Sequence, residues 1–121
     1  GIKFAREGCR LSDISAAVQA YVEANGFSIV REYVGHGIGR RMHEPPEVPN
    51  YGKPGHGPRL LRGMTIAVEP MVNAGSAAIA QMPDGWTVKT ADGKNAAHYE
   101  NTILITAGEP ELLTDPEKSL V

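Results

Sequence analysis

Residues 12–25 read SDISAAVQAYVEAN, and this stretch decides the fold class that the sequence predicts. Apolar side chains recur at positions 14, 17, 18, 21 and 22, which is the spacing of one face of an amphipathic helix. Ser12 is placed to cap the amino end, and Asn25-Gly26 is placed to end the helix through a left-handed residue. We therefore expect a helix over residues 12–25, packed along one face.

The segments after this helix have the character of strands. Residues 27–33 alternate and predict a short strand, and MTIAVEPMV at 64–72 predicts a mostly buried one. Residues 86–90 and 96–106 predict two strands that form a hairpin around a turn at 92–93. One helix followed by antiparallel strands indicates the α+β class, with the helix covering one face of a curved sheet.

Two segments predict little regular structure. Residues 45–58, PPEVPNYGKPGHGP, contain five prolines and three glycines, so we expect an irregular surface loop, with His56 as an ordinary loop residue. Residues 108–121, GEPELLTDPEKSLV, predict a short strand and an acidic tail.

Composition excludes some classes of partner. The formal net charge of −2 gives no general attraction to nucleic acid or to a membrane surface. The sequence shows neither a charged-then-apolar leader nor an apolar run near twenty residues, so export and membrane insertion are not indicated. Cys9 is the single cysteine and cannot form an internal disulfide, which is typical of a reducing compartment. We expect one cytoplasmic domain or part of a larger one.

Residues 35–47, GHGIGRRMHEPPE, suggest two common motifs, and both fail. The three glycines are followed by Arg40, where a dinucleotide-binding fingerprint needs another glycine. His43 and Glu44 could begin the zinc-binding pattern H-E-x-x-H, but the prolines at 45–46 prevent the helix that this pattern requires. Nucleotide binding and a zincin-type helix are therefore not expected.

A metal site assembled from separate strands fits these residues better. Glycines allow a close approach of backbone, and the donors available are His36, His43, Glu69 and Glu100. Both glutamates lie in segments that otherwise read as buried, and a buried carboxylate without a partner costs several kcal/mol. The alternative is that each glutamate pairs with an arginine. Taken together with His36, the two glutamates favour a shared divalent ion such as Mn, Fe, Co or Zn.

Strand alternation adds two possible supporting residues. If Glu100 points into the site, His98 and Thr102 share its face and could orient a metal ligand. The alternative for His98 is simple exposure to solvent.

Four stretches of the chain resemble the bacterial-type (type 1) methionine aminopeptidases in order and spacing. They are NGFSIVREYVGHGIGRRMHEPPEVPNYG at 25–52, MTIAVEPMVNAGS at 64–76, DGWTVKTADGKNAAHYENT at 84–102 and LLT at 112–114. The resemblance implies the "pita-bread" fold, in which two similar α+β halves enclose a dinuclear metal centre. It further implies that residues 1–121 are the C-terminal half of a metallo-aminopeptidase catalytic domain.

The resemblance also implies metal-binding roles. His36 and Glu69 would be ligands, and Glu100 would bridge two divalent ions, of Co, Mn, Fe or Zn. Glu69 would in addition carry the proton from the attacking water to the leaving amine. The implied activity is metal-dependent removal of the N-terminal methionine from peptides and nascent proteins.

Three residues have implied roles toward the substrate. His43 would hydrogen-bond the scissile peptide and stabilise the developing oxyanion. Met42 and Trp86 would border the pocket for the methionine side chain.

The chain also departs from the family pattern. Two strand-borne aspartates and a further histidine, which precede this region in the family, have no counterpart here, and Asn101 stands where a histidine is common. We therefore expect weak metal affinity and negligible turnover from these residues alone, together with self-association or a companion segment. Two alternatives are a non-catalytic binding protein and an X-Pro-cleaving peptidase, both of the same fold.

Overall fold

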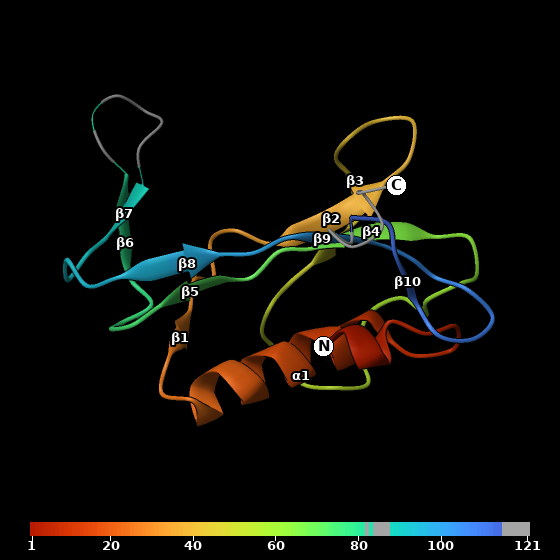
Figure 1. Cartoon of the computed structure of the whole chain (residues 1–121), viewed down its shortest axis with the longest axis horizontal. Coiled ribbons are helices and arrows are strands. Elements are labelled where there is room, and N and C mark those ends of the chain that lie inside the picture. The colour runs from red at the N-terminus through yellow and green to blue at the C-terminus, as the bar shows by residue number, and fades with distance from the viewer. Residues whose placement is uncertain (82, 84–87, 115–121) are drawn as a thin grey trace.

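A single long helix lies under antiparallel strands in the computed structural model, which describes residues 1–81, 83 and 88–114 (Figure 1). The helix α1 (Leu11–Ala24) covers one face of a five-stranded sheet of order β10-β9-β4-β2-β3. A three-stranded sheet, β1-β5-β8, continues from it, and β6 and β7 form a separate pair. The predicted α+β class is confirmed.

The bounds of these elements are as follows. A 3-10 turn (Ile2–Phe4) precedes α1, and the strands are β1 (Ser28–Ile29), β2 (Gly35–Ile38), β3 (Glu44–Val48), β4 (Thr65–Val68), β5 (Met71–Asn73), β6 (Ile79–Gln81), β7 (Val88–Thr90), β8 (Ala96–His98), β9 (Asn101–Leu104) and β10 (Glu111–Leu112).

The expected helix is present, but its cap differs from the prediction. The N-cap is Arg10, whose backbone N–H donates to the Asp13 carboxylate over 2.8 Å. Ser12 lies inside the first turn, and its hydroxyl accepts instead from the backbone N–H of His56. Gly26 follows the helix with φ +83°, as the sequence suggested. Within the described residues, no helix has the length and apolar character needed to cross a membrane.

The core lies between α1 and the five-stranded sheet. The helix contributes Ile14 and Val18, and the central strands contribute Ile66 and Ile103, which face each other across β4 and β9. Ile14, Ile66 and Ile103 are fully buried. Burial of each such side chain stabilises the fold by about 1.5–3 kcal/mol, so packing holds the sheet in place above the helix.

The expected irregular loop over 45–58 begins as a strand, and that part of the prediction was wrong. Residues 44–48 form β3, which pairs with β2 and contains the cis peptide Pro45-Pro46. Prolines are tolerated there because β3 is an edge strand, where an N–H is not needed on the outer side. Residues 49–58 form no strand, and the loop is fastened to α1 through His56, as described above, and through Gly55, whose N–H donates to Asp13.

The single strand expected over 64–72 is two strands, β4 and β5, which belong to different sheets. The break falls at Glu69-Pro70, because proline has no N–H to donate to a ladder. The partner segment breaks in the same place, so that residues 96–106 provide β8 and β9 on either side of residues 99–100.

The predicted hairpin between residues 86–90 and 96–106 was also wrong. β7 pairs with β6, and β8 pairs with β5. The turn at Asp92 explains the difference, since its carboxylate accepts the N–H groups of both Ser76 and Lys94. This fastens the turn to the segment before β6 and directs the chain away from a β7–β8 hairpin.

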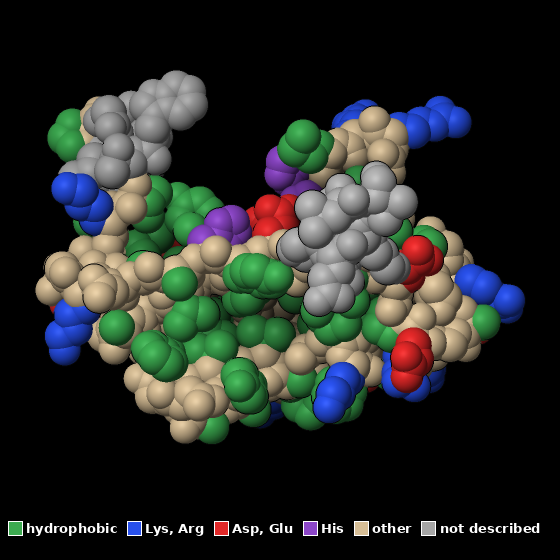
Figure 2. Space-filling model, viewed as in Figure 1, with side chains coloured by type: hydrophobic (Ala, Val, Ile, Leu, Met, Phe, Trp, Pro, Cys, Tyr) green, Lys and Arg blue, Asp and Glu red, His purple; other side chains and the backbone are tan. Residues whose placement is uncertain are grey.

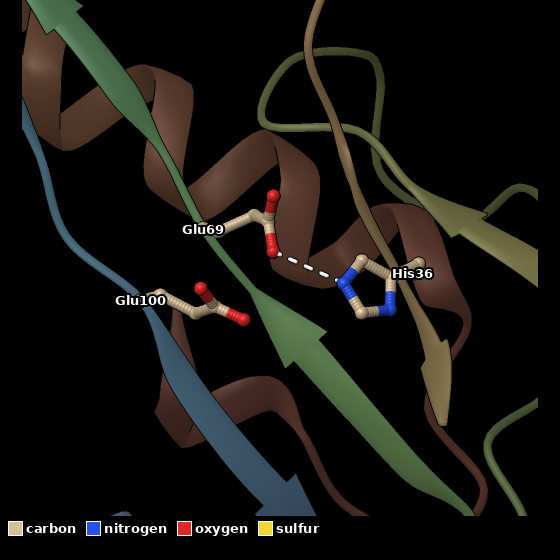
Figure 3. Close-up of side chains that lie close together, drawn as sticks. All are labelled: His36, Glu69 and Glu100. Carbon is tan, nitrogen blue, oxygen red and sulfur yellow. Dashed lines mark ion pairs between the residues drawn. The ribbon is translucent and has the colours of Figure 1, made fainter. Parts of the chain in front are cut away.

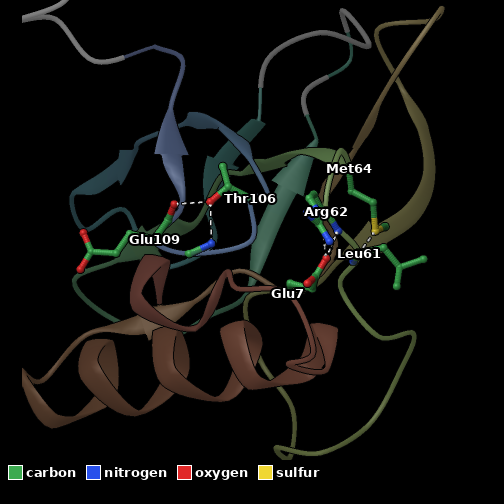
Figure 4. A network of polar contacts seen from close by, with 7 residues as sticks. Glu7, Leu61, Arg62, Met64, Thr106 and Glu109 are labelled. Carbon is green, nitrogen blue, oxygen red and sulfur yellow. Dashed lines mark hydrogen bonds and ion pairs between the residues drawn. The ribbon is translucent and has the colours of Figure 1, made fainter.

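Polar contacts fasten the start of the chain to the loop before β4 (Figure 4). The Glu7 carboxylate accepts the backbone N–H of Arg62 at 3.2 Å and lies 3.3 Å from its guanidinium Nε. In the same loop the N–H of Leu61 donates to the sulfur of Met64. Near β10, the hydroxyl of Thr106 donates to the backbone carbonyl of Glu109.

Candidate metal centre

The glycines of β2 allow three strands to pack closely. A Cβ atom on Gly35 would collide with the backbone carbonyl of Ala67 on β4, and one on Gly37 with the carbonyl of Pro45 on β3. The sequence indicated that these glycines permit a close approach of backbone, and in the structure the approaching groups are the neighbouring strands. The glycines therefore fix the position of the residue between them, His36.

Strand register places His36, Glu69 and Glu100 on one face. His36 pairs with Ala67, whereas Gly35 pairs with the buried Val48, so His36 points away from α1. Val68 pairs with Asn101 and Met71 with His98, and the same register sets Glu69 opposite Glu100. Figure 3 shows the three side chains converging: His36 comes from β2, Glu69 follows the end of β4, and Glu100 precedes the start of β9.

The three side chains form a cluster of metal-binding geometry. One donor atom from each of His36, Glu69 and Glu100 lies within 4.8 Å of the others. Nε2 of His36 is 3.2 Å from a carboxylate oxygen of Glu69, and Nδ1 is 3.0 Å from the backbone carbonyl of Gly37. Because a carbonyl only accepts, Nδ1 carries the proton, and the lone pair of a neutral His36 is then on Nε2, directed at the cluster.

The electrostatics of the cluster favour a bound cation. Burial raises the pKa of Glu69, and the nearby Glu100 carboxylate raises it further, while His36 and His98 act in the opposite direction. Two carboxylates directly opposite across a strand pair repel each other. The alternative of pairing with arginine is not realised among the described residues, where arginine ion pairs go to Glu7 and Glu109. Imidazole and carboxylate donors therefore fit a divalent metal ion.

His43 lies beside the cluster in an open cleft. Its ring centroid is 4.1 Å from that of His36, with the planes tilted by 48°. The cleft has a volume of about 500 Å³, and His36, His43, Glu47 and Glu69 line it. Figure 2 shows histidine and acidic side chains at the bottom of a hollow between two raised parts of the surface, which carry β6–β7 and the β2–β3 loop.

The three remaining predicted site residues are not members of the cluster, and one of them is outside the residues that the structure describes. Met42, in the β2–β3 loop, is 74% exposed and is not one of the residues that line the cleft. His98 is exposed, at the end of β8, close enough to lower the pKa of Glu69. Trp86 lies outside the described residues.

Sequence reasoning missed Asn50. Its side chain is fully buried, and its amide donates to the backbone carbonyl of Glu69 over 3.4 Å. Asn50 thus supports the point where β4 ends and the chain changes sheets. Nothing in the sequence around it, PNYG, distinguishes this buried asparagine from an ordinary turn residue.

An α+β sheet that gathers an imidazole and two carboxylates on one face, beside an open cleft, is the arrangement of a metal-binding protein. The sequence model of metallopeptidase family M24 matches residues 1–107, and the chain belongs to that family.

Curated relatives carry the name methionine aminopeptidase. The one from Clostridium perfringens is 61% identical over 114 residues, and methionine aminopeptidase 1 of Bacillus subtilis is 55% identical over the same length. Each alignment covers 94% of this chain and 46% of the relative. The chain therefore spans about half the length of the curated relatives that it matches.

Solved structures agree with this grouping. The methionine aminopeptidase from Thermotoga maritima superposes with a TM-score of 0.92 at 51% identity, covering 94% of this chain and 46% of that one. A prolidase from Pyrococcus horikoshii reaches a TM-score of 0.61 at 24% identity, covering 99% of this chain and 29% of that one, and shows the shared fold alone.

Proposed function

We propose that residues 1–121 form the C-terminal half of a metallo-aminopeptidase that removes the N-terminal methionine from peptides and nascent proteins in the cytoplasm. The observation that carries this proposal is the convergence of donor atoms from His36, Glu69 and Glu100 within 4.8 Å. The names of the relatives support the substrate class.

The three clustered side chains would hold the metal, which we infer to be two divalent ions of Co, Mn, Fe or Zn in the intact enzyme. Glu100 offers its carboxylate beside that of Glu69, and both would be donors to the metal. When bound, the ions would supply Lewis-acid polarisation of the scissile carbonyl and a water of lowered pKa.

The remaining steps belong to side chains of this chain. Glu69 is suited to accept and return a proton, because its carboxylate lines the cleft and lies 3.2 Å from Nε2 of His36 in the cluster. His43 contacts the ring of His36 and lines the cleft, from where its ring can donate a hydrogen bond to the carbonyl of a bound peptide. Met42 and Trp86 are proposed to border the methionine side chain.

The experiment measures peptide cleavage by two preparations. One is the chain alone, and the other is the chain supplied with the rest of a relative. We expect negligible release of methionine from a Met-Gly-x peptide by the chain alone, because three donors hold a dinuclear centre incompletely. Release by the chain alone at a rate near that of a full-length relative would refute this expectation. In the completed protein, cleavage of x-Pro dipeptides in preference to Met-Gly-x would favour the prolidase-like alternative, and no cleavage of either would favour a binding protein.

A further inference from the structure

The loop that carries His43 is not held by burial. Residues 39–43 join β2 to β3, and all five are exposed. The loop stands on one raised side of the hollow in Figure 2. The ring centroid of His43 nevertheless lies 4.1 Å from that of His36 at its base. An exposed loop of this kind opens easily unless polar contacts close it, so the position of His43 depends on such contacts.

The Glu44 carboxylate supplies them from inside the loop. Glu44 is the first residue of β3, and the ladder pairs it with Gly37 on β2. Its side chain turns back over the loop, where a carboxylate oxygen accepts the backbone N–H of Arg41 over 2.9 Å. The N–H of Gly39 donates in turn to the carbonyl of Arg41 over 3.1 Å. These two hydrogen bonds close the loop around the carboxylate.

Gly39 leaves the space that this carboxylate fills. A Cβ atom at position 39 would collide with both carboxylate oxygens of Glu44. The φ of Gly39 is not positive, so glycine is needed there for space and not for an unusual backbone conformation. His43 directly precedes Glu44 in the chain. A side chain that ties Arg41 to the start of β3 therefore also fixes the short stretch of backbone from which the imidazole projects.

We propose that Glu44 is a positioning residue for His43: its carboxylate closes the turn over residues 39–44 and holds the imidazole beside His36 before a substrate binds. The proposal rests on the proposed function only for what His43 then does to a substrate. A donor that is held in advance loses less conformational freedom when it binds a carbonyl. The glutamate that suggested an H-E-x-x-H zinc motif thus serves the site through the backbone of its loop.

The test follows both contacts in the chain with a chelator and without substrate, so that it gives an answer even if the proposed peptidase activity fails. Nuclear Overhauser effects between the labelled rings of His36 and His43 report their contact, and amide exchange reports the N–H of Arg41. Glu44→Ala should reduce the ring cross-peaks and the protection of this N–H at least tenfold each. Glu44→Gln should restore both, because its amide carbonyl can accept the same hydrogen bond.

Two further variants distinguish this role from general loosening of the loop. Arg41→Ala is the matched control, because it removes an exposed side chain and keeps the backbone N–H, so both signals should stay at the wild-type level. Gly39→Ala should displace the carboxylate and reproduce the effect of Glu44→Ala, and it replaces that variant if circular dichroism shows Glu44→Ala unfolded.

Four results would overturn the proposal. They are the absence of ring cross-peaks in the wild type, cross-peaks that persist in Glu44→Ala or Gly39→Ala, a failure of Glu44→Gln to restore them, and an equal loss in Arg41→Ala.

Discussion

Glu69 and Glu100 lie opposite each other at the point where two neighbouring strands change sheets. The register that pairs Val68 with Asn101 on one side and Met71 with His98 on the other passes through them without a shift. Pro70 interrupts the ladder there, so two carboxylates meet where the backbone is least regular. Their mutual repulsion is offset when a cation binds between them, which makes metal binding and local stability parts of the same effect.

Replacing either glutamate should weaken metal binding. Glu69→Gln or Glu100→Gln removes an anionic donor from a cluster of three, and we expect the affinity for Mn²⁺ or Zn²⁺ to fall at least tenfold, or about 1.4 kcal/mol. Isothermal titration calorimetry measures the change. Glu47→Gln is the control, since Glu47 lines the same cleft without belonging to the cluster. An equal loss in all three variants would show that general cleft charge, and not the cluster, holds the ion.

The pKa of Glu69 predicts a pH dependence for the metal-free chain. Its folded-state pKa is raised, so the proton-bound form stabilises the fold fully below the unfolded pKa, and this contribution is lost as the pH rises through the folded pKa. We therefore expect the wild type to lose stability relative to Glu69→Gln as the pH rises from below the ordinary glutamate range toward neutrality. Thermal unfolding in chelator, compared across pH for the two proteins, measures this. A constant difference between them would contradict it.

Adding metal should reverse that trend. An ion that requires ionised Glu69 displaces its proton, so metal-dependent stabilisation should grow with pH over the same interval. Repeating the unfolding series with excess Mn²⁺ provides the check, and Glu69→Gln should show the smaller gain at every pH.

Local pattern was sufficient to predict the helix and to single out three side chains that the structure brings together. The 3.6-residue spacing over 12–25 reports burial on one face, and α1 lies there. His36, Glu69 and Glu100 stood out because each is polar among residues that pack, and the structure brings these three together. Strand alternation around Glu100 likewise agrees with the position of His98 near Glu69.

Local sequence pattern did not predict which strands pair with each other. β7 pairs with β6, and not with the segment after the 92–93 turn, because the Asp92 carboxylate binds backbone on both sides of the turn. Pro70 was the sequence signal for the split of residues 64–72 into β4 and β5. The continuous apolar pattern of the segment concealed it, because that pattern is also typical of one unbroken strand. Asn50 could not have been found, since its importance depends on a carbonyl nineteen residues away.

The Asp92 contacts predict a second pH effect of the opposite sign. Backbone N–H groups of Ser76 and Lys94 lower the pKa of this carboxyl, so its contribution is present above the unfolded pKa and is lost as the pH falls through the folded pKa. Asp92→Asn should therefore destabilise the chain at neutral pH and have a smaller effect in acid. Urea unfolding at both pH values tests this, with the exposed Glu32→Gln as control. If the loss of stability caused by Asp92→Asn were larger in acid than at neutral pH, this explanation would be wrong.

The glycines of β2 give the sharpest structural test. Gly35→Ala places a methyl group against the carbonyl of Ala67, which is backbone of the central strand β4 and cannot turn aside as a side chain would. We expect a loss of about 1–3 kcal/mol in the free energy of unfolding, since either the strand pair separates or the sheet shifts. The shift would move His36 relative to Glu69, so metal affinity should fall as well. Gly108→Ala is the matched control, because no atom lies within 4 Å of its added Cβ and its φ is outside the left-handed region. If Gly35→Ala retains the stability of Gly108→Ala, then close packing of β2 against β4 does not position the histidine.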